Sequence, residues 1–189
     1  MRLKEKDDMI DQAGIMMAQG LGTASERIQG VNDNMSQSHY HEYFEIYYLE
    51  AGERFHMVED QLYHMEQGEF MIFPPYVMHH SYGEKNVPFK RLVLYFTPEE
   101  VLWPSILTEL KEEIGVYQVD IRERQEIHRL MEILLKEQNN PGLHHDEFNQ
   151  GIINVLLLLI LRQKHPERAS ENSSRIGEVI RYIHMHYQE

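Results

Sequence analysis

The sequence contains no cysteine, and its 18 lysines and arginines are outnumbered by 31 aspartates and glutamates. The absence of cysteine excludes a disulfide framework, a thiolate metal site and a cysteine nucleophile. The formal net charge of −13 gives a surface that repels a polyanion, whereas nucleic-acid affinity depends mainly on neutralising phosphates. If the protein regulates genes, these 189 residues are therefore not the part that binds DNA.

The sequence also has no long hydrophobic run. The strongest run, Ile152 to Leu161, is interrupted by Asn154 and reaches about half of the ~20 residues that a membrane span needs, so it predicts a buried helix. The opening residues MRLKEKDDMIDQ carry charges of both signs and no apolar core, which excludes a secretory signal. We expect a cytoplasmic protein without membrane contact.

Residues 23–100 predict a β structure. Short runs rich in aromatic and β-branched residues alternate with turn residues, as in Tyr40 to Leu49, Gly52 and Arg54 to Val58. Strands this short and evenly spaced are typical of an all-β sandwich or barrel. Further strands are expected over 61–65, 70–73, 79–82 and 89–96.

Helices are expected on both sides of this β region. Residues 1–22 place their apolar side chains on one side of a helical segment, and residues 101–165 repeat that pattern several times. Residues 166–189 predict a polar linker and one more helix. Within the 101–165 region, helices are expected over about 104–114, 121–138 and 144–164. The last of these is apolar nearly all round, so it is covered on more than one side. Two arrangements stay open: burial within one subunit, or burial between the β domain and a second subunit.

Histidines and a carboxylate concentrate in one predicted strand. Side chains alternate between the two faces of a strand, so a regular strand places every second residue of this segment on one face. The residues that would share that face are His39, His41, Tyr43, Glu45 and Tyr47.

A neighbouring strand adds His79 to this set. Three imidazole nitrogens and the Glu45 carboxylate could hold a divalent ion, and the donor set suits zinc, nickel, iron or manganese. Two alternatives stay open. The same side chains could bind an organic ligand by hydrogen bonds, or a buried Glu45 could simply accept hydrogen bonds from its neighbours.

Two spacings in this segment resemble the paired motifs of the cupin superfamily. The first is HxHxxxE, followed by G after six further residues. The second is G, then P after five residues, then H after four more. The matching residues are His39, His41, Glu45, Gly52, Gly68, Pro74 and His79. The motif register selects His79 over its neighbour His80 as the inward side chain. Two positions depart from the pattern: Tyr76 replaces the usual glycine of metal-dependent cupin enzymes, and Gly83 stands where the motif closes with asparagine.

A longer stretch narrows the resemblance. The segments HYHEYFEIYYLEAGERFHMVEDQLYHMEQGEFMIFPPYVMHHSY and RLVLYFTPEEV look like the effector-binding domain of AraC-type transcription regulators. The end, RIGEVIRYIHMHYQE, resembles the first helix of that family's DNA-binding half. The resemblance implies a double-stranded β-helix barrel that holds a small effector, followed by helices that form a homodimer. It also implies paired helix-turn-helix motifs, which this sequence lacks, so DNA would be bound only through a missing half. The sequence is then either an expressed fragment or the product of a truncated gene, and we favour the fragment.

The expected function is therefore effector sensing and dimerisation, not catalysis. The effector is expected to be sugar-like or another small polar molecule. It would contact His39, His41, Glu45, Tyr47 and His79. A metal-dependent cupin enzyme of the dioxygenase or isomerase type is the alternative, although the departure at Tyr76 weighs against it.

Three further side chains have two interpretations each. His56 and His64 either line the pocket or lie at its rim. Arg54 either pairs with an anionic effector or is an exposed charge at a sheet edge.

Overall fold

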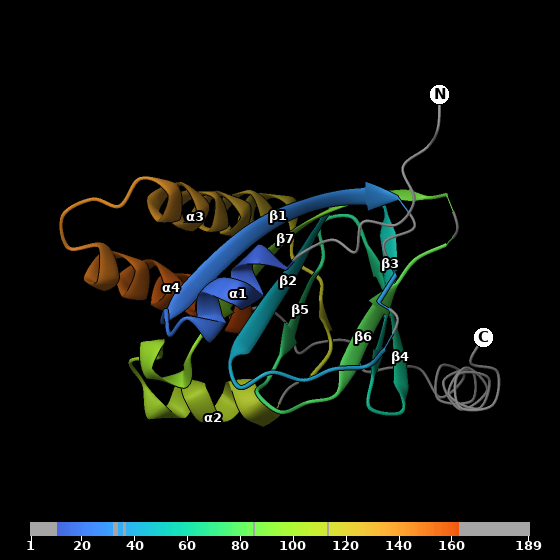
Figure 1. Cartoon of the computed structure of the whole chain (residues 1–189), viewed down its shortest axis with the longest axis horizontal. Coiled ribbons are helices and arrows are strands. Elements are labelled where there is room, and N and C mark those ends of the chain that lie inside the picture. The colour runs from blue at the N-terminus through green and yellow to red at the C-terminus, as the bar shows by residue number, and fades with distance from the viewer. Residues whose placement is uncertain (1–10, 32–33, 36, 85, 113, 163–189) are drawn as a thin grey trace.

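The computed structural model describes residues 11–31, 34–35, 37–84, 86–112 and 114–162, which form two antiparallel sheets and a set of helices (Figure 1). The linker and terminal helix expected over 166–189 lie outside the described residues, as does the first half of the helical segment expected over 1–22.

Two sheets contain all the strands described. The larger sheet has the order β1 (Thr23–Val31), β7 (Pro88–Phe96), β2 (Phe44–Ala51), β5 (Phe70–Phe73) and β8 (Val116–Tyr117). The smaller sheet has the order β4 (Gln61–Glu66), β3 (Glu53–Val58) and β6 (His79–Tyr82). The expected double-stranded β-helix with helices after it is confirmed. Its wall consists of two facing sheets of the jelly-roll type, and the described strands do not hydrogen-bond into one closed barrel.

The five-stranded sheet is buried on both faces. Along β7, Leu92 and Leu94 belong to a core shared with the helices, whereas Val93 and Tyr95 belong to a core shared with the smaller sheet. This arrangement follows from the alternation of side chains along a strand, and it explains why β7 is apolar at nearly every position. The space between the two sheets is called the interior below.

Four α-helices and one short 3₁₀ helix complete the described chain. They are α1 (Gln12–Ala18), the 3₁₀ helix η1 (Pro98–Glu100), α2 (Pro104–Glu112), α3 (Ile121–Asn139) and α4 (His145–Leu161). Asp120 caps α3, because its carboxylate accepts hydrogen bonds from the amides of Arg122 and Glu123. The three helices expected between 104 and 164 are each found within a few residues of their predicted bounds.

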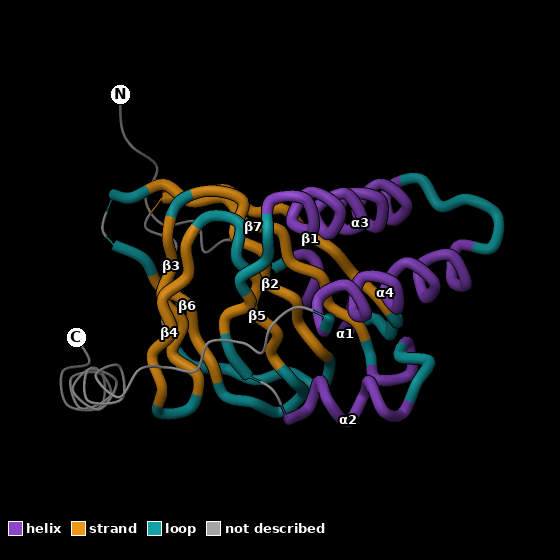
Figure 2. The backbone as a smooth tube through the Cα atoms, turned by 180° about the vertical axis from the view of Figure 1, so that it is seen from behind, coloured by secondary structure: helices purple, strands orange, loops and turns teal. Residues whose placement is uncertain are grey.

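The helices α3 and α4 run side by side against the larger sheet, as Figure 2 shows from behind. In α4, Ile153, Leu156 and Leu157 are fully buried within the chain, whereas Phe148 and Val155 remain 43% and 49% exposed. Part of the apolar surface of α4 is therefore covered by its own subunit. Among the described residues, no helix combines the length and apolar character that crossing a bilayer requires.

The largest difference from the sequence prediction lies before β2. The strand expected from Tyr40 begins only at Phe44, so the histidines that precede it are not part of a regular strand. His39 instead forms an isolated bridge with His79, through two backbone hydrogen bonds of 3.0 and 2.9 Å. The amide of Tyr76 donates to the carbonyl of His41 at 2.8 Å. These contacts with a distant turn hold the segment in an irregular course.

Candidate functional site

Three histidines and one glutamate meet at the edge of the interior. The Nε2 atom of His41 lies 3.2 Å from Oε2 of Glu45, and Nε2 of His79 lies 3.5 Å from the same oxygen. The ring of His39 is centred 4.5 Å from the ring of His79. Side-chain nitrogens of the three histidines lie within 4.8 Å of one another. We call His39, His41, Glu45 and His79 the histidine cluster.

Backbone carbonyls fix the orientation of two of these imidazoles. Nδ1 of His41 donates to the carbonyl of Tyr43 at 2.7 Å, and Nδ1 of His79 donates to the carbonyl of Val77 at 2.8 Å. A carbonyl oxygen can only accept, so in the neutral ring the proton is on Nδ1 and the lone pair of Nε2 faces Glu45. Histidines that bind metals are typically held in this way, with the second nitrogen bonded to a carbonyl.

The electrostatics of the histidine cluster favour a bound cation. Burial alone would raise the pKa of Glu45, but hydrogen bonds and charge from the imidazoles of His41 and His79 hold that pKa well below its usual value, so a proton shared with these rings leaves the carboxylate ionised. Burial and the neighbouring His79 lower the pKa of His39 to about 4, so this ring is neutral at neutral pH. Lone pairs and a carboxylate that converge at these distances need a proton or a metal ion between them. The donor set therefore fits a divalent ion.

Tyr47 lies farther along the same face of β2. It is 1% exposed, and its ring meets His56 edge-on with 4.5 Å between ring centres. Phe73 connects this pair to the histidine cluster, because its ring is centred 4.3 Å from that of His79 and 5.4 Å from that of His56. The structure therefore brings together four of the five expected ligand residues and places Tyr47 beside them.

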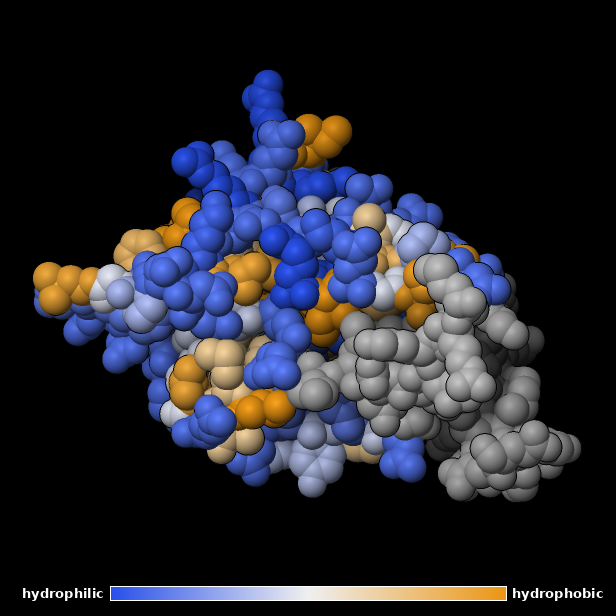
Figure 3. Space-filling model, turned by 45° about the horizontal axis from the view of Figure 1, so that its top comes forward, coloured by the Kyte–Doolittle hydropathy of each residue, from blue (hydrophilic) through white to orange (hydrophobic). Residues whose placement is uncertain are grey.

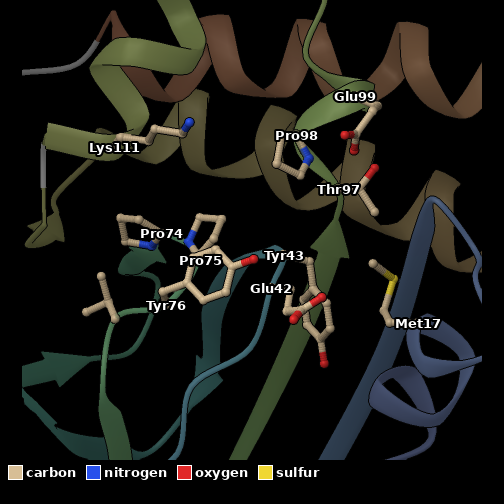
Figure 4. Close-up of a pocket in the computed structure, with 11 residues that line it drawn as sticks. Met17, Glu42, Tyr43, Pro74, Pro75, Tyr76, Thr97, Pro98, Glu99 and Lys111 are labelled. Atoms are coloured by element: carbon tan, nitrogen blue, oxygen red, sulfur yellow. The ribbon is translucent and has the colours of Figure 1, made fainter.

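A pocket of about 620 Å³ opens next to the histidine cluster, between α2 and the turn that follows β5 (Figure 4). Tyr43 is the link between the two, since it lines the pocket and stacks on His41 with 4.3 Å between ring centres. The pocket is lined by Met17, Glu42, Tyr43, Pro74, Pro75, Tyr76, Val77, Thr97, Pro98, Glu99 and Lys111. Tyr76 has a φ of 65°, a left-handed conformation that costs a non-glycine residue energy. This explains why glycine is usual at that position of the motif.

The family model for the AraC-like ligand binding domain matches residues 27–176, which is most of the chain. The chain belongs to the AraC-like ligand-binding domain family. Among solved structures, this AraC-like domain is similar to the AraC-like transcriptional activator CuxR, with a TM-score of 0.53 and 10% sequence identity. That match covers 85% of this chain and 56% of CuxR, so the chain spans little more than half of its length. At this identity, the likeness shows the fold alone.

Two other solved structures match at lower TM-scores. A cupin from Methanocaldococcus jannaschii is 17% identical at a TM-score of 0.37, over 40% of this AraC-like domain and 70% of the cupin. An oxalate decarboxylase variant from Bacillus subtilis is 16% identical at a TM-score of 0.37, over 45% of this domain and 24% of the enzyme. No curated protein matches the sequence.

Several side chains of this AraC-like domain lie where the sequence left a choice open. The expected choice between the adjacent histidines agrees with the structure, because His79 faces Glu45 whereas His80 hydrogen-bonds with Ser38. His56 is 1% exposed, so its placement at the rim is wrong. The exposed-edge interpretation of Arg54 is also wrong: its guanidinium is buried and donates to the hydroxyl of Ser81.

A second polar group joins the larger sheet to α3, and the sequence analysis missed it. Glu50 of β2 accepts from Arg27 at 2.9 Å and from His128 of α3 at 2.7 Å, and it lies 3.4 Å from Lys90. Arg27 also contacts Glu132 of α3. Two permanent cations already neutralise Glu50, so this group is better suited to fixing the helix on the sheet than to holding a metal. Only the pairing of distant elements reveals it.

Proposed function

We propose that this chain is the effector-sensing and dimerisation domain of a transcription regulator, and that it is not a catalyst. Residues 23–100 would bind a small polar molecule, sugar-like or similar, between the two sheets. The proposed contacts are His39, His41, Glu45, Tyr47 and His79. The observation that supports this proposal is the convergence of three imidazoles and a carboxylate at the interior of an AraC-like ligand-binding domain.

If the domain binds a divalent ion, the histidine cluster would hold it, and the ligands would be His39, His41, Glu45 and His79. Such an ion would polarise an oxygen of the effector as a Lewis acid. The protein's own part is to orient the imidazoles through the carbonyls of Tyr43 and Val77.

A bound effector could act on the rest of the chain through α1. Tyr95 lies on the interior face of β7, 5.6 Å from the ring of His41, and its hydroxyl donates to Asp11 at the start of α1 at 3.2 Å. The amide of Ala13 in α1 donates to Glu26 at 3.1 Å. The domain would have two states that differ in the position of α1. An effector that binds one state more tightly than the other shifts the equilibrium between them, and only by that difference in affinity.

Residues 101–165 would form the dimer interface. The outer face of α4 carries a stripe of apolar residues, in which Phe148 and Val155 alternate with Ile152 and Leu159, and the last two are already partly buried against the chain's own core. Phe148 and Val155 are exposed in the single chain. The face of the molecule shown in Figure 3 is largely hydrophilic, with hydrophobic residues in small separate groups. We propose that the same face of a second copy covers this stripe. DNA would be bound only outside this domain, in the cytoplasm.

The test is effector and metal binding by matched variants. Glu45→Gln removes the charge of a buried carboxylate that lies 3.2 Å from a histidine nitrogen. Glu53→Gln is the control, because Glu53 lies 3.2 Å from His64 in an exposed pair on the outer side of the smaller sheet. We expect Glu45→Gln to lose binding of zinc and of any stabilising sugar in calorimetry, and Glu53→Gln to retain both. Equal binding by the two variants would exclude the histidine cluster as the site.

A metal-dependent cupin enzyme of the dioxygenase or isomerase type is the second candidate, because the same four side chains could serve chemistry. Oxygen uptake or sugar isomerisation by the iron-, manganese- or nickel-loaded protein, lost in Glu45→Gln, would favour the enzyme over the sensor.

A further inference from the structure

The pocket beside the histidine cluster has walls that suit an apolar ligand body. Its volume of about 620 Å³ lies within the range of sites for small organic molecules. Apolar and aromatic side chains make up most of its lining, which includes three prolines, Met17, Val77, Tyr43 and Tyr76. No member of the histidine cluster lines the pocket. An occupant of this pocket would therefore be a ligand at a separate site.

Tyr76 forms one side of this pocket at an energetic cost. Its φ of 65° lies in the left-handed region, which glycine adopts freely and tyrosine does not. The side chain is 65% exposed, so the ring gains little from burial. The amide of Tyr76 donates to the carbonyl of His41, but a glycine in the same conformation could make that bond. A strained residue with an exposed ring at a pocket points to a ligand that uses the ring.

Two carboxylates give the pocket a negative potential. Glu42 lies next to Tyr43, and Glu99 of η1 lies across the pocket from them (Figure 4). Both glutamates are exposed, and neither forms an ion pair with another described residue. Burial first, and then the charges of Asp146 and Glu99, raise the pKa of Glu100 at this edge. The negative charge here is therefore not neutralised by the chain's own cations.

Lys111 is the one cation among the described residues that line the pocket. It lies in the last turn of α2, where a positive charge interacts favourably with the helix dipole whether or not the pocket binds a ligand. One ammonium group against the two lining carboxylates, Glu42 and Glu99, leaves the pocket with a net negative charge. The formal charge of −13 for the whole chain adds to this potential.

We propose that this pocket binds an organic cation, in which an ammonium group is attached to an apolar or aromatic body. The ammonium group would lie between the carboxylate of Glu42 and the rings of Tyr43 and Tyr76, because cations are attracted both by carboxylates and by the faces of aromatic rings. The prolines and Met17 would contact the body of the ligand. This site goes beyond the proposed function, since none of the proposed effector contacts lines the pocket.

The test compares amines with molecules of the same shape and different charge on the full chain. The probes are phenethylamine against phenethyl alcohol and hydrocinnamate, and choline against its uncharged carbon analogue. Calorimetric affinity and melting temperature are the readouts, at constant ionic strength. We expect at least one cation to bind about threefold or more tightly than its neutral counterpart, and hydrocinnamate to bind more weakly than either partner of its set.

Two charge variants should change amine affinity in opposite directions. Glu42→Gln removes a carboxylate beside the ammonium group, so affinity should fall about threefold. Lys111→Gln removes a like charge, so affinity should rise about twofold. The matched controls are Glu53→Gln, on the outer side of the smaller sheet, and Lys136→Gln, in the last turn of α3. Both should leave amine affinity unchanged.

Tyr76→Gly separates ligand binding from a structural role. It removes the ring and relieves the left-handed strain, so the melting temperature of the ligand-free protein should stay equal or rise while amine affinity falls about threefold. Tyr76→Phe keeps the ring and should retain the affinity. A lower melting temperature in ligand-free Tyr76→Gly would show that the ring serves the fold, and it would overturn the role given to Tyr76.

The outcomes also separate this inference from the proposed function. Alcohols that bind as well as amines, no response to any amine, or full amine affinity in Glu42→Gln would each overturn the cation site. Amine binding that Glu45→Gln abolishes would place the amine at the histidine cluster and overturn it too. Sugar or zinc binding that Glu45→Gln abolishes while amine binding persists would support both sites.

Discussion

Replacing His56 should change how the stability of this domain depends on pH. His56 is buried with a neutral ring, because burial and then Arg54 lower its pKa well below the usual 6.5. In the unfolded chain the ring takes up a proton as the pH falls through about 6.5, whereas in the folded chain it does not. The unfolded state thus binds more protons below that pH, so this residue's contribution to stability is complete above about pH 6.5 and is lost as the pH falls.

The size of this effect follows from proton linkage. One proton bound by the unfolded state alone lowers the free energy of unfolding by about 1.4 kcal/mol for each pH unit. Between about pH 5.5 and pH 4.5, His56→Phe should therefore flatten the stability curve by roughly that amount relative to the wild type. At neutral pH the variant should be as stable as the wild type or more so, because two unpaired buried nitrogens are removed.

Urea unfolding at a series of pH values measures this slope directly. His64→Phe serves as the control, since His64 lies on the neighbouring strand with its side chain 43% exposed. Its slope should stay closer to that of the wild type. Equal slopes for His56→Phe and the wild type would refute the conclusion that His56 is buried in its neutral form.

Three further outcomes are expected. Val155→Glu should abolish the proposed dimer in sedimentation while circular dichroism shows a folded chain. Leu156→Glu should instead unfold the chain, because Val155 is 49% exposed and Leu156 fully buried. Glu50→Gln should lower the free energy of unfolding by about 3 kcal/mol in urea, because the side chain of Glu50 is 8% exposed and its loss leaves Arg27 without that partner. The control, Glu53→Gln at an exposed pair, should lower it by about 0.5 kcal/mol or less. Asp120→Ala should cost about 1 kcal/mol in the same assay, because it removes the cap of α3.

The sequence predicted most strands and helices because their signals are local. Turn residues such as Gly52 and Gly68 have a φ of 85° and 89°, and they bound strands where a left-handed conformation is needed. The two-residue strand β8 was missed, since Val116–Tyr117 is too short to show a period and is defined only by its pairing with β5. Elements with a local sequence pattern could thus be predicted, whereas an element defined only by long-range pairing could not.

The candidate site shows the same division. The motif spacing predicted that His41, Glu45 and His79 meet, and they do, but the strand that was expected to align them begins after His41. The pocket could not be predicted, because it depends on where α2 lies against the turn that contains Tyr76. The burial of His56 likewise depends on which face of a short strand turns inward.

The strand β2 carries the proposed ligand contacts and the helix contacts on alternate residues, with Tyr47 in one core and Tyr48 in the other. Deleting or inserting a single residue upstream within this strand would exchange the two sets, so that polar recognition groups would meet the helices and apolar anchors would enter the interior. A change of specificity in this domain should therefore come from substitutions in β2, whereas changes of length should be tolerated only in the loops. Engineering a new specificity should follow the same course and keep the length of β2 fixed.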